Sequence, residues 1–207
     1  MKIINYGHAC FKIIDDDISL ILDPYRDGSV PGLNLPKELD ANYVFKSHDH
    51  YDHDALNKVK IIRNDKSLNM MEIDLPHDDV NGAKRGRSIA RLFKFSDYSI
   101  CHMGDIGDVN AVINCDALKG VDIVLCPING FYTISAEGAI HLKEKMSWKI
   151  LIPMHYEYNG TGYPDGGQIN IFKKKITNIL EVEDEVEIDQ SVFKFDSIIF
   201  KSYKRGV

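Results

Sequence analysis

The chain has 207 residues, of which 44% are hydrophobic and 27% are charged, a composition typical of a globular protein rather than a disordered one. The formal net charge of −6 argues against a nucleic-acid-binding surface, which usually carries a basic patch. No stretch reaches the roughly 18 consecutive apolar residues of a membrane-spanning helix, and Met1–Asn5 becomes polar too early for a signal peptide.

Four cysteines are scattered along the chain without a C-x-x-C pair: Cys10, Cys101, Cys115 and Cys126. In a chain without an export signal, cysteines in this arrangement are expected to be reduced. We therefore expect a cytoplasmic protein that binds neither a membrane nor nucleic acid.

The first half of the sequence predicts β-structure. Three β-like segments open the chain, and Asp15–Asp17 marks a hairpin turn between the second and the third. The strands expected in this half cover residues 2–6, 10–15, 18–23, 42–47, 59–63, 69–74, 90–95 and 98–103.

The second half alternates helices with strands. Ser135 is a suitable N-cap for a helix over 135–147, and apolar residues at helical spacing predict another helix over 168–180. The remaining elements are expected as a helix over 108–119, buried strands over 121–126 and 149–153, and paired strands over 185–203. This order indicates a mixed α/β layered fold. Because no low-complexity linker divides the chain, we expect one domain over residues 1–207.

The run His48-Asp49-His50-Tyr51-Asp52-His53 closely follows the apolar segment Tyr43–Phe45. Side chains alternate along a strand, so His48 and His50 point the same way if the strand continues to them. A tight turn would then bring Asp52 and His53 to a second position nearby. The spacing therefore predicts a site for two adjacent metal ions.

Three later segments each end a predicted strand with a potential metal ligand. These ligands are His77, His102 together with Asp105, and His155. Strand ends suit a metal site, because rigid elements hold the ligands while the loops admit substrate.

With these segments together, the sequence resembles the metallo-β-lactamase superfamily of binuclear metallohydrolases. The resemblance rests on Tyr6–Phe11, Ile21–Pro24, His48–His53, His77, Gly104-Asp105 and Pro153–Tyr156. The first and last of these segments are similar to a branch that includes ascorbate-phosphate lactonase-like proteins. The resemblance implies a four-layer αββα sandwich and a hydrolytic enzyme.

The resemblance also implies a set of ligands for two divalent ions. They are His48, His50 and His77 for the first ion, Asp52, His53 and His155 for the second, and Asp105 as a bridge. Three neutral imidazoles with a water form a common open zinc site. His102 competes with His77 for the third position; we favour His77, because the loop between Gly82 and Gly86 that follows it matches the family layout.

Zinc is the metal we expect, and imidazole–carboxylate sites also accept Mn or Fe. Diiron redox members of the superfamily typically carry Glu where this chain has His50, which favours hydrolysis over electron transfer. Two adjacent ions lower the pKa of a shared water from about 15.7 toward about 7, giving a bridging hydroxide. Asp52 is expected to orient this hydroxide.

Three further residues have two interpretations each. Asp23 either accepts a hydrogen bond from a ligand imidazole or forms a turn before Pro24. His8 either contacts substrate or makes a structural hydrogen bond, and Tyr156 either donates its hydroxyl to substrate or packs as an aromatic. Asp52, His8 and Tyr156 are thus the candidate catalytic residues.

Two loops near these ligands are also notable. The basic run Lys84–Arg87 either grips a phosphate or carboxylate or is a solvated turn. The glycine-rich segment 160–167 is a candidate for a mobile rim. His141, on the helix over 135–147, is expected at the surface.

The sequence therefore predicts a binuclear metal-dependent hydrolase that acts on a small anionic ester, lactone or phosphoester, with the oligomeric state left open. A phosphodiesterase or nuclease of the same fold is an alternative, which the acidic charge disfavours. A metal-binding protein without catalytic activity is the third hypothesis.

Overall fold

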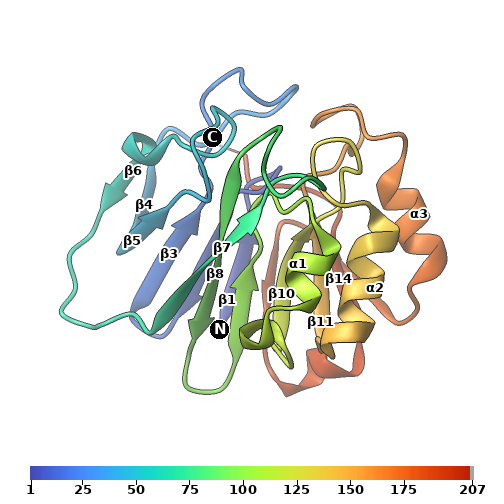
Figure 1. Ribbon diagram of the computed structural model, residues 1–207. Helices are drawn as coiled ribbons and strands as arrows, with labels where there is room; N and C mark the ends of the chain where they lie inside the picture. Colours follow the sequence, from blue (N-terminus) through green and yellow to red (C-terminus); the bar gives the residue numbers. More distant parts are fainter. Residues whose placement is uncertain (206–207) are drawn as a thin grey trace.

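The computed structural model describes residues 1–205. Two β-sheets face each other, and three α-helices cover the outer face of the larger sheet (Figure 1). The helices are α1 (Val109–Ile113), α2 (Ala136–Met146) and α3 (Gln168–Lys175). Single 3-10 turns lie at Leu56–Lys58, Asp116–Leu118 and Gln190–Lys194.

The smaller sheet has five strands. In spatial order they are β13 (Glu185–Glu187), β1 (Lys2–Asn5), β2 (Phe11–Asp15), β3 (Ile18–Leu22) and β5 (Tyr43–Phe45). Strands β1, β2 and β3 pair antiparallel, because short turns join them, whereas β3 and β5 pair parallel. The long connection between β3 and β5 permits that parallel pairing.

The larger sheet has seven strands. In spatial order they are β12 (Ile179–Val182), β14 (Ser197–Phe200), β11 (Ile150–Met154), β10 (Ile123–Pro127), β9 (Ser99–His102), β8 (Arg87–Lys94) and β7 (Met70–Pro76). Strands β9, β10 and β11 run parallel, so their carboxyl ends meet at one edge. Two further strands, β4 (Leu39–Ala41) and β6 (Val59–Ile61), form a separate parallel pair.

The core between the sheets follows the alternation of side chains along each strand. Ile3 and Ile13 of the five-stranded sheet pack with Ile123 and Ile150 of the seven-stranded sheet. The intervening side chains point outward: Val124 and its neighbours pack against the helices. Strands β10 and β11 are buried throughout, which explains their continuous apolar sequences.

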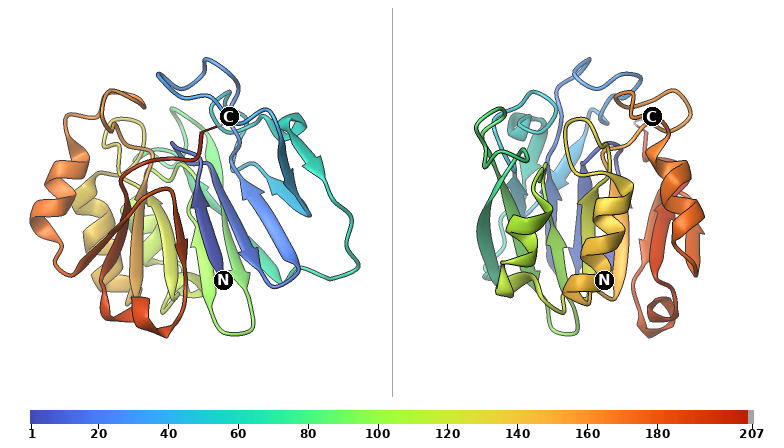
Figure 2. Two further views of the ribbon diagram at one scale, coloured as in Figure 1. Left: turned by 180° about the vertical axis from the view of Figure 1, so that it is seen from behind. Right: turned by 45° about the vertical axis from the view of Figure 1, so that its right-hand side comes forward.

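An α/β sandwich is therefore confirmed. A helical layer was expected on the outer face of the five-stranded sheet, but the segment between β3 and β4 covers part of that face instead. Ile21 of the sheet packs there against Tyr25 and Leu33 of this segment. Within residues 1–205 no α-helix covers this face, and Figure 2 shows the three α-helices together on the opposite side of the molecule. Pro31 and Pro36 in that segment are incompatible with a helix interior.

Three predicted elements of the second half differ from the structure. The helix expected over 168–180 ends at Lys175: Ile176 is already extended, Asn178 has a positive φ, and Ile179 begins β12. The helix expected over 108–119 splits into α1 and a 3-10 turn. The paired strands expected over 185–203 are β13 and β14, which belong to different sheets.

No helix in residues 1–205 is long and apolar enough to cross a membrane. The four cysteines are free, and three of them are buried. His141 lies exposed on α2, as predicted from the sequence.

Candidate metal centre

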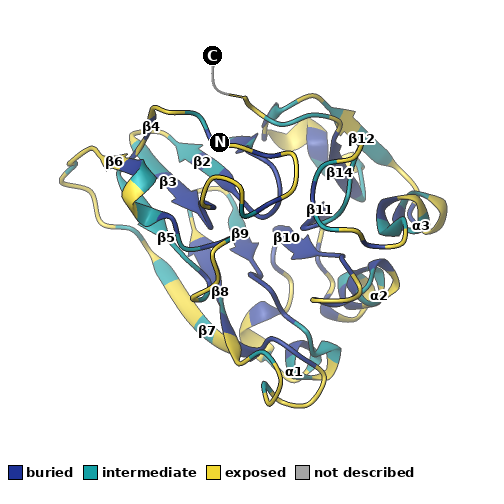
Figure 3. Cartoon of the chain, turned by 90° about the horizontal axis from the view of Figure 1, so that it is seen from above, coloured by how far each residue is buried: buried dark blue, intermediate teal, exposed yellow. Residues whose placement is uncertain are grey.

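The predicted ligands gather at one edge of the two sheets, where the carboxyl ends of six strands meet. His8 follows β1, Asp23 follows β3, and the run His48–His53 follows β5. Across from them, His77 follows β7, and Asp105 and His155 follow β9 and β11. Figure 3 looks down on this edge. Residues 147 positions apart in the sequence, His8 and His155, are thereby joined by a backbone hydrogen bond of 3.0 Å.

Two groups of potential donor atoms that share no residue lie at this edge. The first group contains His48, His50 and His77, and the second contains His8, Asp52, His53 and His155. A third combination, His48 with His53 and Asp105, links the two. Within each group, all donor atoms lie within 4.8 Å of one another. In the first group, Nε2 of His48 is 2.7 Å from Nδ1 of His50. The predicted ligands therefore lie close together, and His8 joins the second group; the assignment of ligands to two ions stays a prediction.

Asp105 lies between the two groups. Its Oδ2 atom is 3.2 Å from Nε2 of both His53 and His155 in the second group. The same oxygen is 3.6 Å from Nε2 of His77 and 4.0 Å from Nε2 of His48 in the first group. One carboxylate thus faces imidazoles from both groups, which is the position that a bridging ligand requires.

The pairing of buried polar atoms tests whether these residues fit a metal. Several have no hydrogen-bond partner within residues 1–205: His8 Nδ1, His53 Nε2, His77 Nδ1, Asp105 Oδ1 and His155 Nδ1. Leaving a buried polar atom unpaired costs about 1–3 kcal/mol, so native proteins usually avoid it. Ligation of a divalent cation would use imidazole nitrogens and carboxylate oxygens of this kind. The donor set therefore fits divalent metal ions.

Asp23 orients His53 from behind the cluster. Its carboxylate accepts hydrogen bonds from His53 Nδ1 at 2.8 Å and from the backbone N–H and hydroxyl of Ser47 at 2.5 and 2.7 Å. Burial alone would raise the pKa of Asp23, but the His53 charge and these hydrogen bonds outweigh it and lower that pKa. The bond to Nδ1 leaves Nε2 of His53 for the cluster, which is the supporting role expected of Asp23.

His102 lies outside both groups. Its Nε2 donates to the carbonyl of Ala9 at 2.9 Å, and its Nδ1 accepts from the N–H of Gly104 at 3.2 Å. Both ring nitrogens are therefore engaged by backbone. Of the two alternatives for the third position, His77 is the one that lies beside Asp105, and the assignment of ligands to ions stays a prediction.

His8 contacts the cluster through Asp52. Its Nε2 is 3.1 Å from Oδ2 of Asp52, and its ring centroid is 3.9 Å from that of His155. Burial and the neighbouring His155 lower the pKa of His8 to about 3, so the ring is neutral. A neutral ring suits both a hydrogen bond to a carboxylate and metal ligation.

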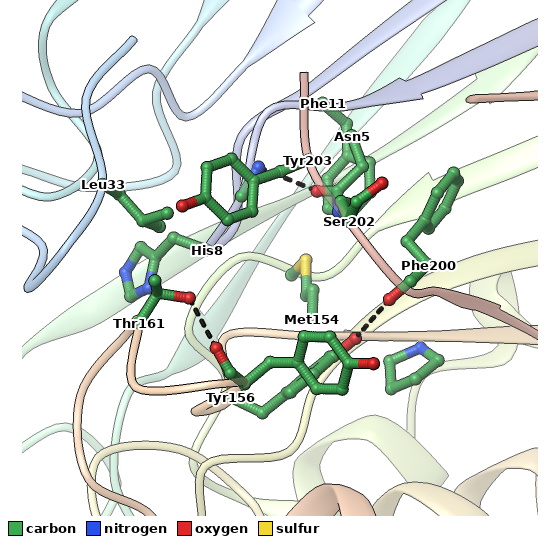
Figure 4. Close-up of a pocket in the computed structure, with 13 residues that line it drawn as sticks. Asn5, His8, Phe11, Leu33, Met154, Tyr156, Thr161, Phe200, Ser202 and Tyr203 are labelled. Atoms are coloured by element: carbon green, nitrogen blue, oxygen red, sulfur yellow. Dashed lines mark hydrogen bonds between the residues drawn. The ribbon is translucent and has the colours of Figure 1, made fainter. Parts of the chain in front are cut away.

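Tyr156 is placed away from the cluster. Its hydroxyl donates to the carbonyl of Phe200 at 3.4 Å, and the residue lines a separate small pocket of about 30 Å³, to which His8 also contributes (Figure 4). Burial raises the pKa of this hydroxyl. Tyr156 packs against the apolar core and does not line the cavity over the donor cluster, which favours the packed-aromatic interpretation.

A cavity of about 330 Å³ opens over the donor atoms. Its lining comprises five cluster residues and three others: His50, Asp52, His77, Asp105, His155, Arg85, Tyr132 and Tyr163. Tyr132 and Tyr163 were not singled out by sequence reasoning. Tyr163 lies in the glycine-rich segment 160–167, whose composition indicated a loop but no particular side chain. Tyr132 lies in an irregular turn after β10 and gave no signal.

The segment 160–167 contributes Tyr163 to the wall of this cavity. The Tyr163 hydroxyl donates to the carbonyl of Ser29 at 2.5 Å, and the N–H of Gly162 donates to the carbonyl of Pro31 at 2.8 Å. The buried carboxylate of Asp165 accepts from the N–H of Glu157 and of Gly167. The bonds to Ser29 and Pro31 tie the segment to the loop between β3 and β4. The centroid of the Tyr163 ring lies 5.6 Å from that of His8 and 6.2 Å from that of His155.

Two glycines allow Asp105 to reach its position. A Cβ at Gly104 would lie 2.4 Å from the hydroxyl oxygen of Ser88, and one at Gly107 would lie 2.5 Å from the backbone of Asp78. Both contacts are closer than real Cβ atoms approach. Glycine is therefore required for the Asp105 segment to pack against the segment that carries His77.

Two facing sheets with a histidine- and aspartate-rich cluster at the strand ends define the metallo-β-lactamase class of fold. The sequence family described as "Beta-lactamase superfamily domain" matches residues 2–155. The chain belongs to this superfamily, in its metallo-β-lactamase division.

Similar proteins carry the name UPF0173. The chain is 27% identical to a UPF0173 protein of Pyrococcus abyssi, over 85% of this chain and 93% of the relative. It is 26% identical to a UPF0173 metal-dependent hydrolase of Natranaerobius thermophilus, over 75% and 83%. Among solved structures, a metallo-β-lactamase superfamily protein of Thermotoga maritima has a TM-score of 0.73 at 22% identity, covering 98% of this chain and 99% of that one.

Proposed function

We propose that this protein is a binuclear metal-dependent hydrolase of a small anionic substrate. The observation that carries the proposal is the place of Asp105, whose Oδ2 lies within 3.2–4.0 Å of imidazole nitrogens from both donor groups. The curated relatives named metal-dependent hydrolases support the same reaction class. The assignment of zinc, with Mn or Fe as alternatives, follows from the imidazole–carboxylate donor set.

The residues around the cluster would have different roles in the reaction. When bound, two divalent ions would lower the pKa of a shared water to about 7 and polarise the substrate oxygen. The two histidine-rich groups and Asp105 would hold them. Asp23 would keep Nε2 of His53 directed into the cluster, and His8 would fix the Asp52 carboxylate through their 3.1 Å contact. Asp52, which lines the cavity, would orient the attacking water and accept its proton.

The cavity supports a small substrate. Its volume of about 330 Å³ lies near the lower end of the roughly 300–1,000 Å³ typical of ligand pockets. Two carboxylates, Asp52 and Asp105, would offset only half the charge of two divalent ions, and Arg85 adds a further positive charge to the wall. The net charge around the cavity would therefore be positive, which favours a negatively charged ester, lactone or phosphoester. The resemblance to ascorbate-phosphate lactonase-like proteins does not choose among these three.

Metal content and turnover test the proposal. Elemental analysis of the purified protein should find about two Zn, Mn or Fe per chain, and ester, lactone or phosphodiester turnover should be lost on chelation. Asp105→Asn should lower both metal content and turnover. Asp49→Asn is the matched control, because Asp49 lies in the same motif but is exposed and pairs with Lys46. Full metal loading without turnover on any substrate would instead favour a metal-binding protein without catalytic activity.

We also propose a cytoplasmic location. The four free cysteines agree with a reducing compartment, where disulfides are rare. The proposed partner is the small substrate itself.

A further inference from the structure

We propose that Arg85 selects the substrate: its guanidinium binds an anionic group on the arm of the substrate that is not cleaved. This inference rests on the proposed hydrolase function and names the residue that would give it specificity. Arg85 belongs to the basic run Lys84–Arg87. The sequence allowed two interpretations of this run: it binds an anion, or it is a solvated turn.

The three cations of that run have different environments. Lys84 pairs with Asp79 at 3.1 Å, and Arg87 donates to Asp74 at 2.6 Å, so both are neutralised at the surface. The Arg85 side chain makes no ion pair or hydrogen bond to residues 1–205. Its one aromatic contact is with the ring of Tyr132, 5.6 Å from the guanidinium carbon. Arg85 alone of the three lines the cavity over the donor cluster.

The loop that carries Arg85 is built around a buried carboxylate. Asp78 is 2% exposed, and its side chain accepts hydrogen bonds from the N–H groups of Val80, Gly82, Lys84 and Arg85, at 2.7–3.0 Å. Within residues 1–205 the Asp78 carboxylate makes no ion pair with the Arg85 guanidinium. Its four hydrogen bonds instead fix the backbone from which Arg85 projects.

The space around Arg85 has room for the arm of a substrate. Arg85 and Tyr132 line both the cavity over the cluster and a second pocket of about 300 Å³ beside it. The two residues therefore stand where the cavities adjoin. Phe131, on the rim of the second pocket, is 64% exposed. A substrate cleaved at the cluster could extend past Tyr132 and place a carboxylate or phosphate on the guanidinium fork, the geometry that arginine binds well.

The test compares two nitrophenyl esters with acyl chains of equal length, one ending in a carboxylate and the other in a methyl group. In the metal-loaded enzyme, Arg85→Gln should lower kcat/KM about tenfold or more for the carboxylate ester, mainly through KM, and less than about twofold for the neutral ester, as expected for one charge-assisted pair. Arg87→Gln is the matched control with the same change of charge, and it should leave kcat/KM unchanged for both esters. Arg85→Lys should restore part of the loss.

A second measurement is independent of turnover. Calorimetric titration with phenylphosphonate into the metal-loaded protein should show about tenfold weaker binding for Arg85→Gln than for the native chain and for Arg87→Gln. Equal effects of Arg85→Gln and Arg87→Gln on both esters and on phenylphosphonate would overturn the role of Arg85 and leave the hydrolase proposal standing. If neither ester is cleaved by the native enzyme, the calorimetric comparison decides the role of Arg85 by itself.

Discussion

Three residues of the metal centre adopt a left-handed backbone conformation, which is costly for any residue with a side chain. They are His8, Asp23 and His155, with φ of 58°, 46° and 54°. Each costs about 1–2 kcal/mol, and the cost is met by contacts made in the folded state. The N–H of His155 donates to the carbonyl of His8, and Asp23 is held by Ser47 and His53. Strain of this kind collects at functional sites, because there the direction of a side chain matters more than local stability.

The clearest prediction for single residues separates His77 from His102. His77→Ala should remove a donor of the first group, so metal content and turnover should both fall. His102→Ala should retain metal and turnover, but it should lower the melting temperature, because it leaves the buried carbonyl of Ala9 and N–H of Gly104 unpaired at a cost of about 1–3 kcal/mol. Elemental analysis and a thermal melt of both variants check this. The opposite pattern would assign the third ligand to His102.

The residues that sequence reasoning found and those that it missed differ in one physical respect. His48–His53 is a local pattern, and its spacing alone brings donors together. Tyr163 reaches the cavity only because its hydroxyl is bound to Ser29, 134 positions away. Arg85 stands out from Lys84 and Arg87 only when their partners are known. Local spacing is visible in a sequence, whereas partners brought together by folding are not.

At the scale of elements, the parallel strands of the larger sheet are joined at their starting ends by Asp122. Its carboxylate accepts from the N–H and hydroxyl of Ser99, which begins β9, at 2.8 and 2.7 Å. Lys149, just before β11, is 2.6 Å from the same carboxylate. Three neighbouring strands thus begin in register around one side chain.

This arrangement predicts a pH dependence of stability. Burial would raise the pKa of Asp122, but Lys149 and Ser99 outweigh it and lower that pKa. A carboxyl with a depressed folded-state pKa stabilises the protein above its unfolded pKa of about 3.9, and the stabilisation is lost as the pH falls below that value. Asp122→Asn should therefore lower the free energy of unfolding at pH 7 by about 1 kcal/mol or less, since Lys149 is exposed to solvent.

Urea unfolding of native and Asp122→Asn protein at pH 7 and pH 3 measures this difference, which should shrink at the lower pH. Asp116→Asn provides the control, because Asp116 is exposed and pairs only with the nearby Lys119. A difference of the same size at both pH values would mean that Asp122 acts by packing and not by charge.

The strand periodicity and the apolar runs predicted most elements, because each depends on neighbouring residues. The strands with which β12 and β13 pair could not be predicted from neighbouring residues. Leu180 continues the helical spacing of Ile176, yet it lies in β12 and pairs with Ile198 of β14, because the chain is already extended at Ile176. Strand β13 pairs with β1 at the opposite end of the chain. Such pairings depend on the whole topology, which a local pattern does not contain.

At the scale of the whole molecule, the metal centre lies where the two sheets meet. His8 and the His48–His53 run come from the five-stranded sheet, whereas His77, Asp105 and His155 come from the seven-stranded sheet. The sheets share one apolar core, but at this edge the contacts between them are polar, and several of the buried atoms are unpaired. Bound cations would therefore connect the two halves of the sandwich at the edge where apolar packing ends.

Metal removal should then lower the stability of the whole fold as well as the activity. A ligand at about 100 times its dissociation constant stabilises the native state by about 2.7 kcal/mol, which corresponds to about 5–10 °C for a chain of this size. Differential scanning calorimetry with metal and with excess chelator should show this shift as a single transition, because the ligands belong to both sheets. Asp105→Asn should show a much smaller shift, whereas Asp49→Asn should respond as the native protein does. A native melting temperature that chelator leaves unchanged would mean that the cluster binds no metal strongly enough to join the sheets.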